Sequence, residues 1–191
     1  MTWIGIESAI LVSGHMLGRF SILIPVATLA VASGATLERL SFDDLVRKST
    51  HIVRGRIQGR AAAFQGSVIY THYNVQVSER WKGGQDTIDV VVPGGLSGGL
   101  RQSFAGAPDL IDGQEYVLFL WTSKSGLTHI IGLSQGKFDL AKDANGVVLA
   151  SRGEAKEAMI DPVTKKMVPD ASLIMPVDRL RGLVHSKLAG N

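Results

Sequence analysis

Residues 67–81, SVIYTHYNVQVSERW, decide the fold of this chain, because apolar and polar side chains alternate along the whole stretch. One set of alternate positions holds Ile69, Thr71, Tyr73, Val75, Val77 and Trp81, and the other holds Tyr70, His72, Asn74, Gln76 and Ser78. A period of two is typical of a half-buried antiparallel strand. At this length, we expect the strand to curl around a small barrel.

The flanking sequence predicts further strands and two short helices. Apolar stretches indicate strands at 51–57, 87–92, 116–121, 127–133, 136–140 and 147–149. Ser41 and Asp44 have capping-box spacing, which predicts a helix to about Lys48, and Pro176 favours the start of a second helix that ends near Leu188. No helix separates two strands as a parallel crossover requires. We therefore expect a mainly β protein, an OB-like small β-barrel with short flanking N- and C-terminal helices.

The barrel interior can be predicted from the two strongest strands. We expect a shared apolar face from residues of both strands, namely Tyr73, Val75, Val77, Val117 and Phe119. Leu118 and Leu120 would then lie beneath one of the helices.

The first 35 residues read as an export signal. Arg19 supplies a positive charge, residues 20–32 an apolar core, and Ser33 and Ala35 the small residues before a cleavage site. Met16 is a better start than Met1, since residues 1–15 contain no Lys or Arg; one long leader is the alternative. We expect an exported protein, periplasmic or extracellular, with no membrane span after cleavage, because an apolar core of this length is too short for a spanning helix; an uncleaved anchor is the alternative. The expected organisation is a signal peptide at 1–35, the barrel at 36–145, and a C-terminal part at 146–191 with a returning hairpin strand, an irregular segment and a helix packed on the barrel.

Composition restricts the chemistry. The chain has 191 residues and no cysteine, so it can form neither a disulfide nor a thiolate metal site, and it has no thiol nucleophile. The net charge of +3 is small for a nucleic-acid-binding protein, and no nucleic-acid partner is expected. No histidine pair has metal-ligand spacing, so we expect no cofactor and no metal.

Three short motifs occur in an order that resembles the netrin-type module, the OB-fold of the tissue inhibitors of metalloproteinases. They are residues 49–57 after a helix, residues 77–83 closing in Trp-Lys-Gly, and residues 112–120, which include Gly-Gln-Glu-Tyr-Val-Leu-Phe-Leu. Residues 92–95, 134–138 and 175–178 are also similar to an uncharacterised family of exported bacterial proteins. These resemblances imply a protein partner, a secreted metalloprotease. Inhibitors with this module chelate the target zinc through an N-terminal cysteine, which this chain lacks.

A glycine-rich segment at 93–99 predicts a flexible loop and is the expected binding element. Its candidate binding residues are Gly94, Gly95, Leu96, Ser97, Gly98, Gly99 and Arg101. Residues 95–99 also match the Gly-x-Ser-x-Gly elbow of serine hydrolases, with Asp109 or Asp112 and His129 as partners in chain order. Residues 98–103 are poor helix formers, and the elbow requires a helix there.

We expect an exported, non-enzymatic binding protein with no catalytic residue. The alternatives are a small hydrolase using Ser97, and an oligosaccharide- or nucleic-acid-binding OB-fold, for which Arg54, Arg56 and Arg60 would line a groove. We expect the two tryptophans that end apolar strands, Trp81 and Trp121, to pack in or at the end of the barrel. An exposed indole would instead mark a binding patch.

Overall fold

The long alternating stretch forms half of a hairpin around which the rest of the protein is organised. The computed structural model describes residues 36–155 and 157–190. Its helices are α1 (Phe42–Lys48) and α2 (Val177–Ala189), with a 3-10 turn at Leu133–Gly136. Its strands are β1 (Thr36–Glu38), β2 (His51–Gln65), β3 (Val68–Lys82), β4 (Thr87–Pro93), β5 (Gly95–Ser97), β6 (Leu100–Gln102), β7 (Glu115–Thr122), β8 (Thr128–Ile130), β9 (Lys137–Lys142), β10 (Val148–Arg152), β11 (Ala158–Ile160), β12 (Met167–Val168) and β13 (Leu173–Pro176). The prediction of a mainly β protein with short helices near both ends of this part is confirmed. The predicted export signal, 1–35, lies outside the described residues.

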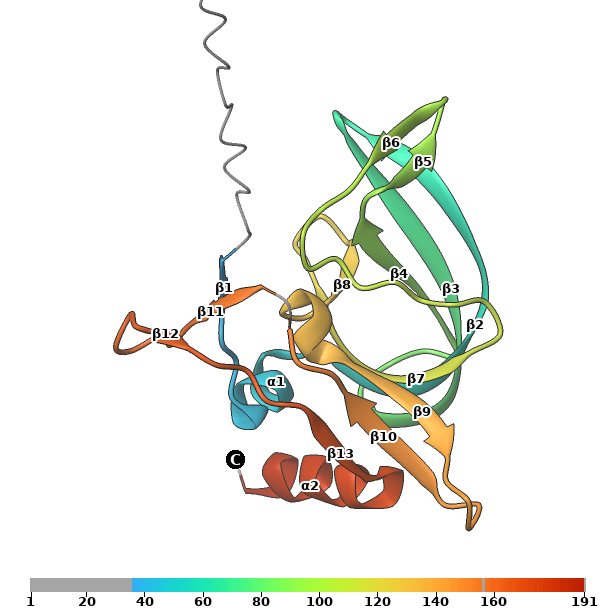
Figure 1. The fold of residues 1–191 in the computed structure, drawn as a ribbon. Helices are drawn as coiled ribbons and strands as arrows, with labels where there is room; N and C mark the ends of the chain where they lie inside the picture. The colour runs from blue at the N-terminus through green and yellow to red at the C-terminus, as the bar shows by residue number, and fades with distance from the viewer. Residues whose placement is uncertain (1–35, 156, 191) are drawn as a thin grey trace, which may run out of the picture. The chain divides into compact units, whose positions relative to one another are not determined.

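Eight strands of the described part form one sheet in the order β13-β10-β9-β7-β2-β3-β4-β8 (Figure 1). The short strand β8 pairs in parallel with β4 and antiparallel with β7, so the pairings β7-β2-β3-β4-β8 return to β7. The result is OB-like, but the barrel is not closed. β2 pairs with β7 only from His51 to Arg56, and beyond Ile57 it pairs with β3 alone. In the upper half of the β2–β3 hairpin, residues 59–74, β3 still pairs with β4, but β2 pairs with no second strand of the described residues, and the barrel is open on that side.

β7 separates two apolar cores. The barrel interior is filled by alternate residues of the ring strands, among them Val53, Tyr73, Val75, Leu118 and Leu120. The second core lies between the other face of the sheet and the helices, and contains Val117, Phe119, Phe138, Leu180 and Val184.

The prediction for β7 was therefore wrong in phase: Leu118 and Leu120 face the barrel interior, and Val117 and Phe119 face the helices. Every residue from Tyr116 to Leu120 is buried, so the sequence of this strand contains no polar face from which the phase could be read.

Trp81 also departs from its predicted face. It is buried in the helix-covered core, whereas Val75, at an alternate position of the same strand, lies in the barrel interior. The pairing of β2 with β3 passes over Ser78 and again over Trp81, so β3 bulges twice and its alternation changes. The first of these bulges falls opposite the step from Arg54 to Gly55 of β2.

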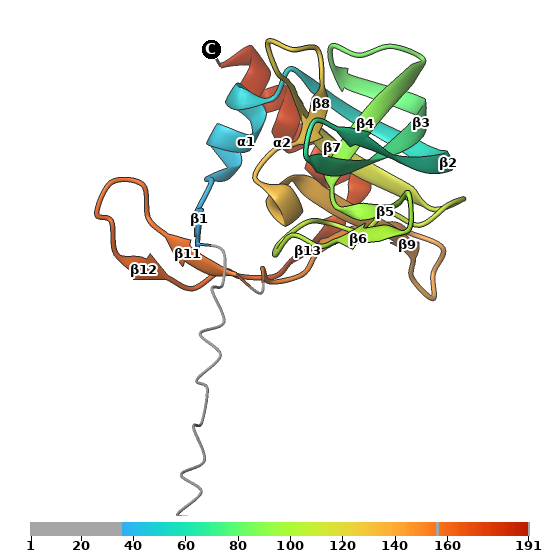
Figure 2. The same cartoon turned by 90° about the horizontal axis from the view of Figure 1, so that it is seen from above.

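Local sequence explains both helices. Ser41 caps α1, its Oγ accepting a hydrogen bond from the Asp44 N–H at 3.0 Å. Acidic residues in the first turn and basic residues in the last turn complement the helix dipole. α2 begins after Pro176 and buries Leu180 and Val184. The helices lie side by side (Figures 1 and 2) and are joined by an ion pair of 2.9 Å between Lys187 and Asp43. Neither helix, and no other helix of the described residues, is long and apolar enough to cross a membrane.

Candidate functional site

The glycine-rich segment is a β-hairpin, and the prediction of a flexible loop was wrong. Gly94 follows β4, and β5 and β6 then pair antiparallel from Gly95 opposite Gln102 to Ser97 opposite Leu100. The turn between them is Gly98-Gly99, with φ of 56° and 78°. Two successive residues with positive φ suit a tight hairpin turn, and glycine adopts this conformation without a side-chain clash.

This hairpin is held firmly against β2 and β3 (Figure 1). The Gln102 side chain accepts a hydrogen bond from the Ile69 N–H at 2.7 Å and donates one to the Ser67 carbonyl at 2.9 Å. The Thr71 hydroxyl donates to the Gly94 carbonyl at 2.7 Å. A Cβ on Gly95 would lie 2.6 Å from Thr71 Oγ1, so only glycine allows this approach. These contacts make the hairpin an ordered element that packs against β2 and β3.

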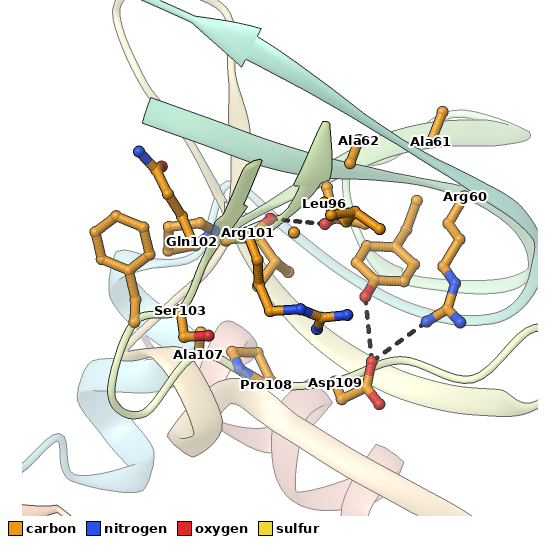
Figure 3. Close-up of a pocket in the computed structure, with 17 residues that line it drawn as sticks. Arg60, Ala61, Ala62, Leu96, Arg101, Gln102, Ser103, Ala107, Pro108 and Asp109 are labelled. Atoms are coloured by element: carbon orange, nitrogen blue, oxygen red, sulfur yellow. Dashed lines mark hydrogen bonds and ion pairs between the residues drawn. The ribbon is translucent and has the colours of Figure 1, made fainter. Parts of the chain in front are cut away.

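A cavity of about 600 Å³ opens between this hairpin, the upper half of β2–β3 and the segment 103–109 (Figure 3). This volume is within the range of ligand-binding sites, about 300–1,000 Å³. Four of the seven predicted binding residues line it, namely Gly94, Gly95, Leu96 and Arg101. Ser97, Gly98 and Gly99 lie outside its lining, in the outer end of the hairpin.

The charged side chains of the cavity differ in whether they have an intramolecular partner. The Asp109 carboxylate accepts a hydrogen bond from the Tyr73 hydroxyl at 3.3 Å and pairs with Arg60 at 3.5 Å. Burial raises the pKa of Tyr73, so the phenol stays protonated and able to donate. The Arg101 side chain makes no hydrogen bond or ion pair with any residue that the structure describes. Figure 3 shows its side chain extending from β6 into the cavity, toward the side on which Asp109 and Arg60 lie.

Large apolar side chains are exposed on and around the hairpin. Leu96 is 56% exposed and Phe104 is 43% exposed, and both line the cavity. Leu100, opposite Ser97 in the hairpin, is also exposed, as is Phe64, whose ring lies 3.4 Å from a Cβ placed on Gly98. Leu96 and Phe104 are on the cavity side, and Leu100 and Phe64 are at the outer end of the hairpin. Exposed apolar side chains are typical of interaction surfaces. We call Leu96, Leu100, Phe104 and Phe64 the apolar rim.

Ser97 does not have the geometry of a nucleophile elbow. It ends a strand, and a glycine turn and a second strand follow it, where the elbow needs a helix. Its hydroxyl makes no hydrogen bond to a histidine within the described residues.

The three arginines of β2 each have a partner within the protein. Arg54 pairs with Glu79 at 2.8 Å and with Glu115 at 2.9 Å, and Arg56 donates to the Gly113 carbonyl at 2.6 Å. Arg60 faces Asp109 and Asp112. Each guanidinium therefore has a partner inside the protein. No cluster of three metal-ligating side chains occurs among residues 36–155 and 157–190.

The two tryptophans differ. Trp81 is buried and its indole donates to Glu79 at 3.0 Å, whereas Trp121 is 46% exposed. The Trp121 indole stacks on His129, with ring centroids 6.0 Å apart, and the Tyr70 ring meets His129 edge-on at 6.2 Å. His72 is on β3, two strands from His129, and its Nδ1 lies 2.8 Å from the Asp89 carboxylate. The exposed indole is thus a second candidate surface, outside the barrel wall.

Several cavity residues were not among the predicted site residues. Arg60 was considered only for nucleic acid, Asp109 only for a catalytic triad, and Tyr73 only for the core. Phe104 follows the hairpin directly, and a large aromatic in a polar, glycine-rich segment is the signal that could have identified it. Searches with this chain find no matching family model, no matching curated protein and no matching solved structure.

Proposed function

We propose that this chain is a non-catalytic binding protein that holds a segment of another protein at the open mouth of the barrel. The observation that supports this most is a cavity of about 600 Å³ flanked by the apolar rim and built on an ordered hairpin. Partner binding would cover the exposed Leu96 and Phe104 side chains, and the hydrophobic effect favours their removal from water. A hairpin that is already ordered loses little conformational freedom on binding.

The partner we propose to test first is a secreted metalloprotease. The support is the resemblance of residues 49–57, 77–83 and 112–120 to the netrin-type module. An N-terminal cysteine cannot take part, because the chain has none. Recognition would therefore rest on the hairpin and the cavity beside it.

Capture of a partner from the medium or periplasm of the native host tests this function. Leu96→Asp places a charge in the apolar rim, and Val163→Asp makes the same change at a residue that is 86% exposed and belongs to the β11–β12 connection. We expect wild type and Val163→Asp to capture the same protein, identified by mass spectrometry, and Leu96→Asp to lose it. Undiminished capture by Leu96→Asp would exclude this surface.

The hydrolase alternative has its own test. Ser97→Ala should capture the partner as wild type does, because Ser97 lies outside the cavity lining. Covalent labelling of Ser97 by a fluorophosphonate probe would overturn the non-catalytic proposal.

Export is part of the proposal, since a secreted partner requires it. We expect the exported protein to begin at or near Thr36, after the small residues Ser33 and Ala35. N-terminal sequencing of the exported protein tests this, and recovery of the whole chain from the cytoplasm would contradict it.

Oligosaccharide binding is a second candidate function, supported by the exposed Trp121 indole. A flat, half-exposed aromatic ring beside polar groups offers a surface for stacking. Intrinsic tryptophan fluorescence during titration with envelope oligosaccharides tests it. A spectral change that Trp121→Ala removes would support this function, and an unchanged spectrum would exclude it.

A further inference from the structure

The cavity contains charged residues that differ in whether they have an ion-pair partner. Its charged lining residues are Arg60, Asp109 and Arg101, two cations and one anion. Arg60 pairs with Asp109 at 3.5 Å and with Asp112 at 3.9 Å, and Asp109 also accepts a hydrogen bond from the Tyr73 hydroxyl. Arg101, on β6, makes no ion pair with any described residue.

The surroundings of Arg101 restrict the anion that would fit. Leu96 lies opposite Arg101 in the hairpin register, and Phe104, Ala107 and Pro108 add apolar lining. An acidic side chain flanked by apolar residues would cover these surfaces while its carboxylate reaches the guanidinium. A guanidinium binds a carboxylate in a planar, two-point geometry, which adds direction as well as strength.

We propose that Arg101 selects partner segments that carry a Glu or Asp side chain between apolar residues, through an ion pair formed within the cavity. The inference rests on the proposed function, because it names the chemistry of the segment that the barrel mouth would hold. Arg101 is a specificity-determining residue in this account, while the apolar rim supplies contact that does not depend on charge.

Two peptide pools test the proposal. Both contain N-acetylated, C-amidated heptapeptides with random apolar flanking residues; the central residue is Glu in one pool and Gln in the other. Peptides retained by the immobilised full chain are quantified by mass spectrometry. We expect wild type to retain the glutamate pool about tenfold more than the glutamine pool, the ratio that a charge-assisted hydrogen bond gives.

A matched pair of variants separates the role of Arg101 from general charge. Arg101→Gln removes the cation of the cavity that has no ion-pair partner, and Arg179→Gln removes a cation from an exposed position of α2. The Arg101 side chain makes no hydrogen bond with the described residues, so its replacement should leave the melting temperature unchanged. We expect Arg101→Gln to retain both pools equally and Arg179→Gln to keep the wild-type preference.

Three results would overturn the proposal: equal retention of both pools by wild type, a glutamate preference that persists in Arg101→Gln, and loss of the preference in phosphate but not in chloride at equal ionic strength. The last result would indicate a site for inorganic anions. The partner capture described above distinguishes this failure from failure of the proposed function. If Leu96→Asp loses the partner while Arg101→Gln keeps it, the binding function stands and the selection of acidic segments is wrong.

Discussion

Truncation of Phe119 should destabilise the protein more than any change on its surface. Phe119 is 0% exposed and lies in the helix-covered core, with ring centroids 6.1 Å from Phe42 and 5.7 Å from Phe138. Removing a fully buried phenylalanine side chain costs about 3–5 kcal/mol, from lost transfer free energy and the cavity left behind. The two aromatic contacts, worth about 0.5–1.5 kcal/mol each, argue for the upper part of that range.

Urea denaturation followed by far-UV circular dichroism measures this change. With a urea dependence of about 2 kcal/mol per molar, Phe119→Ala should lower the unfolding midpoint by about 2 M. Phe119→Leu keeps most of the volume and should lose clearly less, which gives a second measurement if the alanine variant does not fold. Trp121→Ala, at the exposed end of the same strand, is the control and should change the midpoint little. An unchanged midpoint for both Phe119 variants would refute the assignment of this residue to a buried core.

Three further perturbations follow from other contacts. Gly95→Ala should lower the melting temperature more than Gly99→Ala. Both residues have positive φ, but only a Cβ on Gly95 would contact other atoms, among them Thr71 Oγ1 at 2.6 Å, and equal losses would contradict this. Arg152→Met should lower the free energy of unfolding by about 3–5 kcal/mol in urea denaturation, since it leaves Asp170 buried without its partner at 2.9 Å. Lys187→Met breaks an exposed ion pair and should lower it by less than about 1 kcal/mol, and similar losses for the two variants would contradict this. Partial burial acts to raise the pKa of Glu79, but hydrogen bonds from Trp81, Arg54 and Arg181 outweigh it and hold the pKa below its ordinary value. Folding thus favours the charged form of Glu79. Wild type should therefore be more stable than Glu79→Gln above the ordinary glutamate pKa, and this difference in unfolding free energy should decline as the pH falls below it. A difference that is constant with pH would refute this.

Strand periodicity predicted the fold wherever one face of a strand is polar. The alternation in residues 67–81 and the capping of α1 by Ser41 both gave elements that the structure contains. Alternation could not give the phase of β7, whose two faces are both buried, nor the position of Trp81, which depends on bulges in a pairing with a distant strand. The sequence also could not predict that β8 pairs with a strand on each of its edges, because a strand of three residues is too short to show a periodicity.

The candidate site was only partly predictable, for a related reason. Glycine enrichment located the hairpin but was read as a flexible loop, because glycine also serves tight turns and close backbone approaches. Gly94, Gly95, Leu96 and Arg101 were predicted together since they are close in sequence. Arg60, Tyr73 and Asp109 come from three separate segments, and only the folded chain brings them to the same cavity.

The position of β7 between two cores has a consequence for how the protein opens. Val117 pairs with Arg54 of β2 on one edge of the strand and with Phe138 of β9 on the other. A fluctuation that frees the amides at the centre of β7 must therefore separate strands on both sides and expose apolar residues of both cores. Amide hydrogen exchange at Val117, Leu118 and Phe119 should be among the slowest in the protein and should report the global unfolding free energy. Both cores would then lose protection together, as a single cooperative unit.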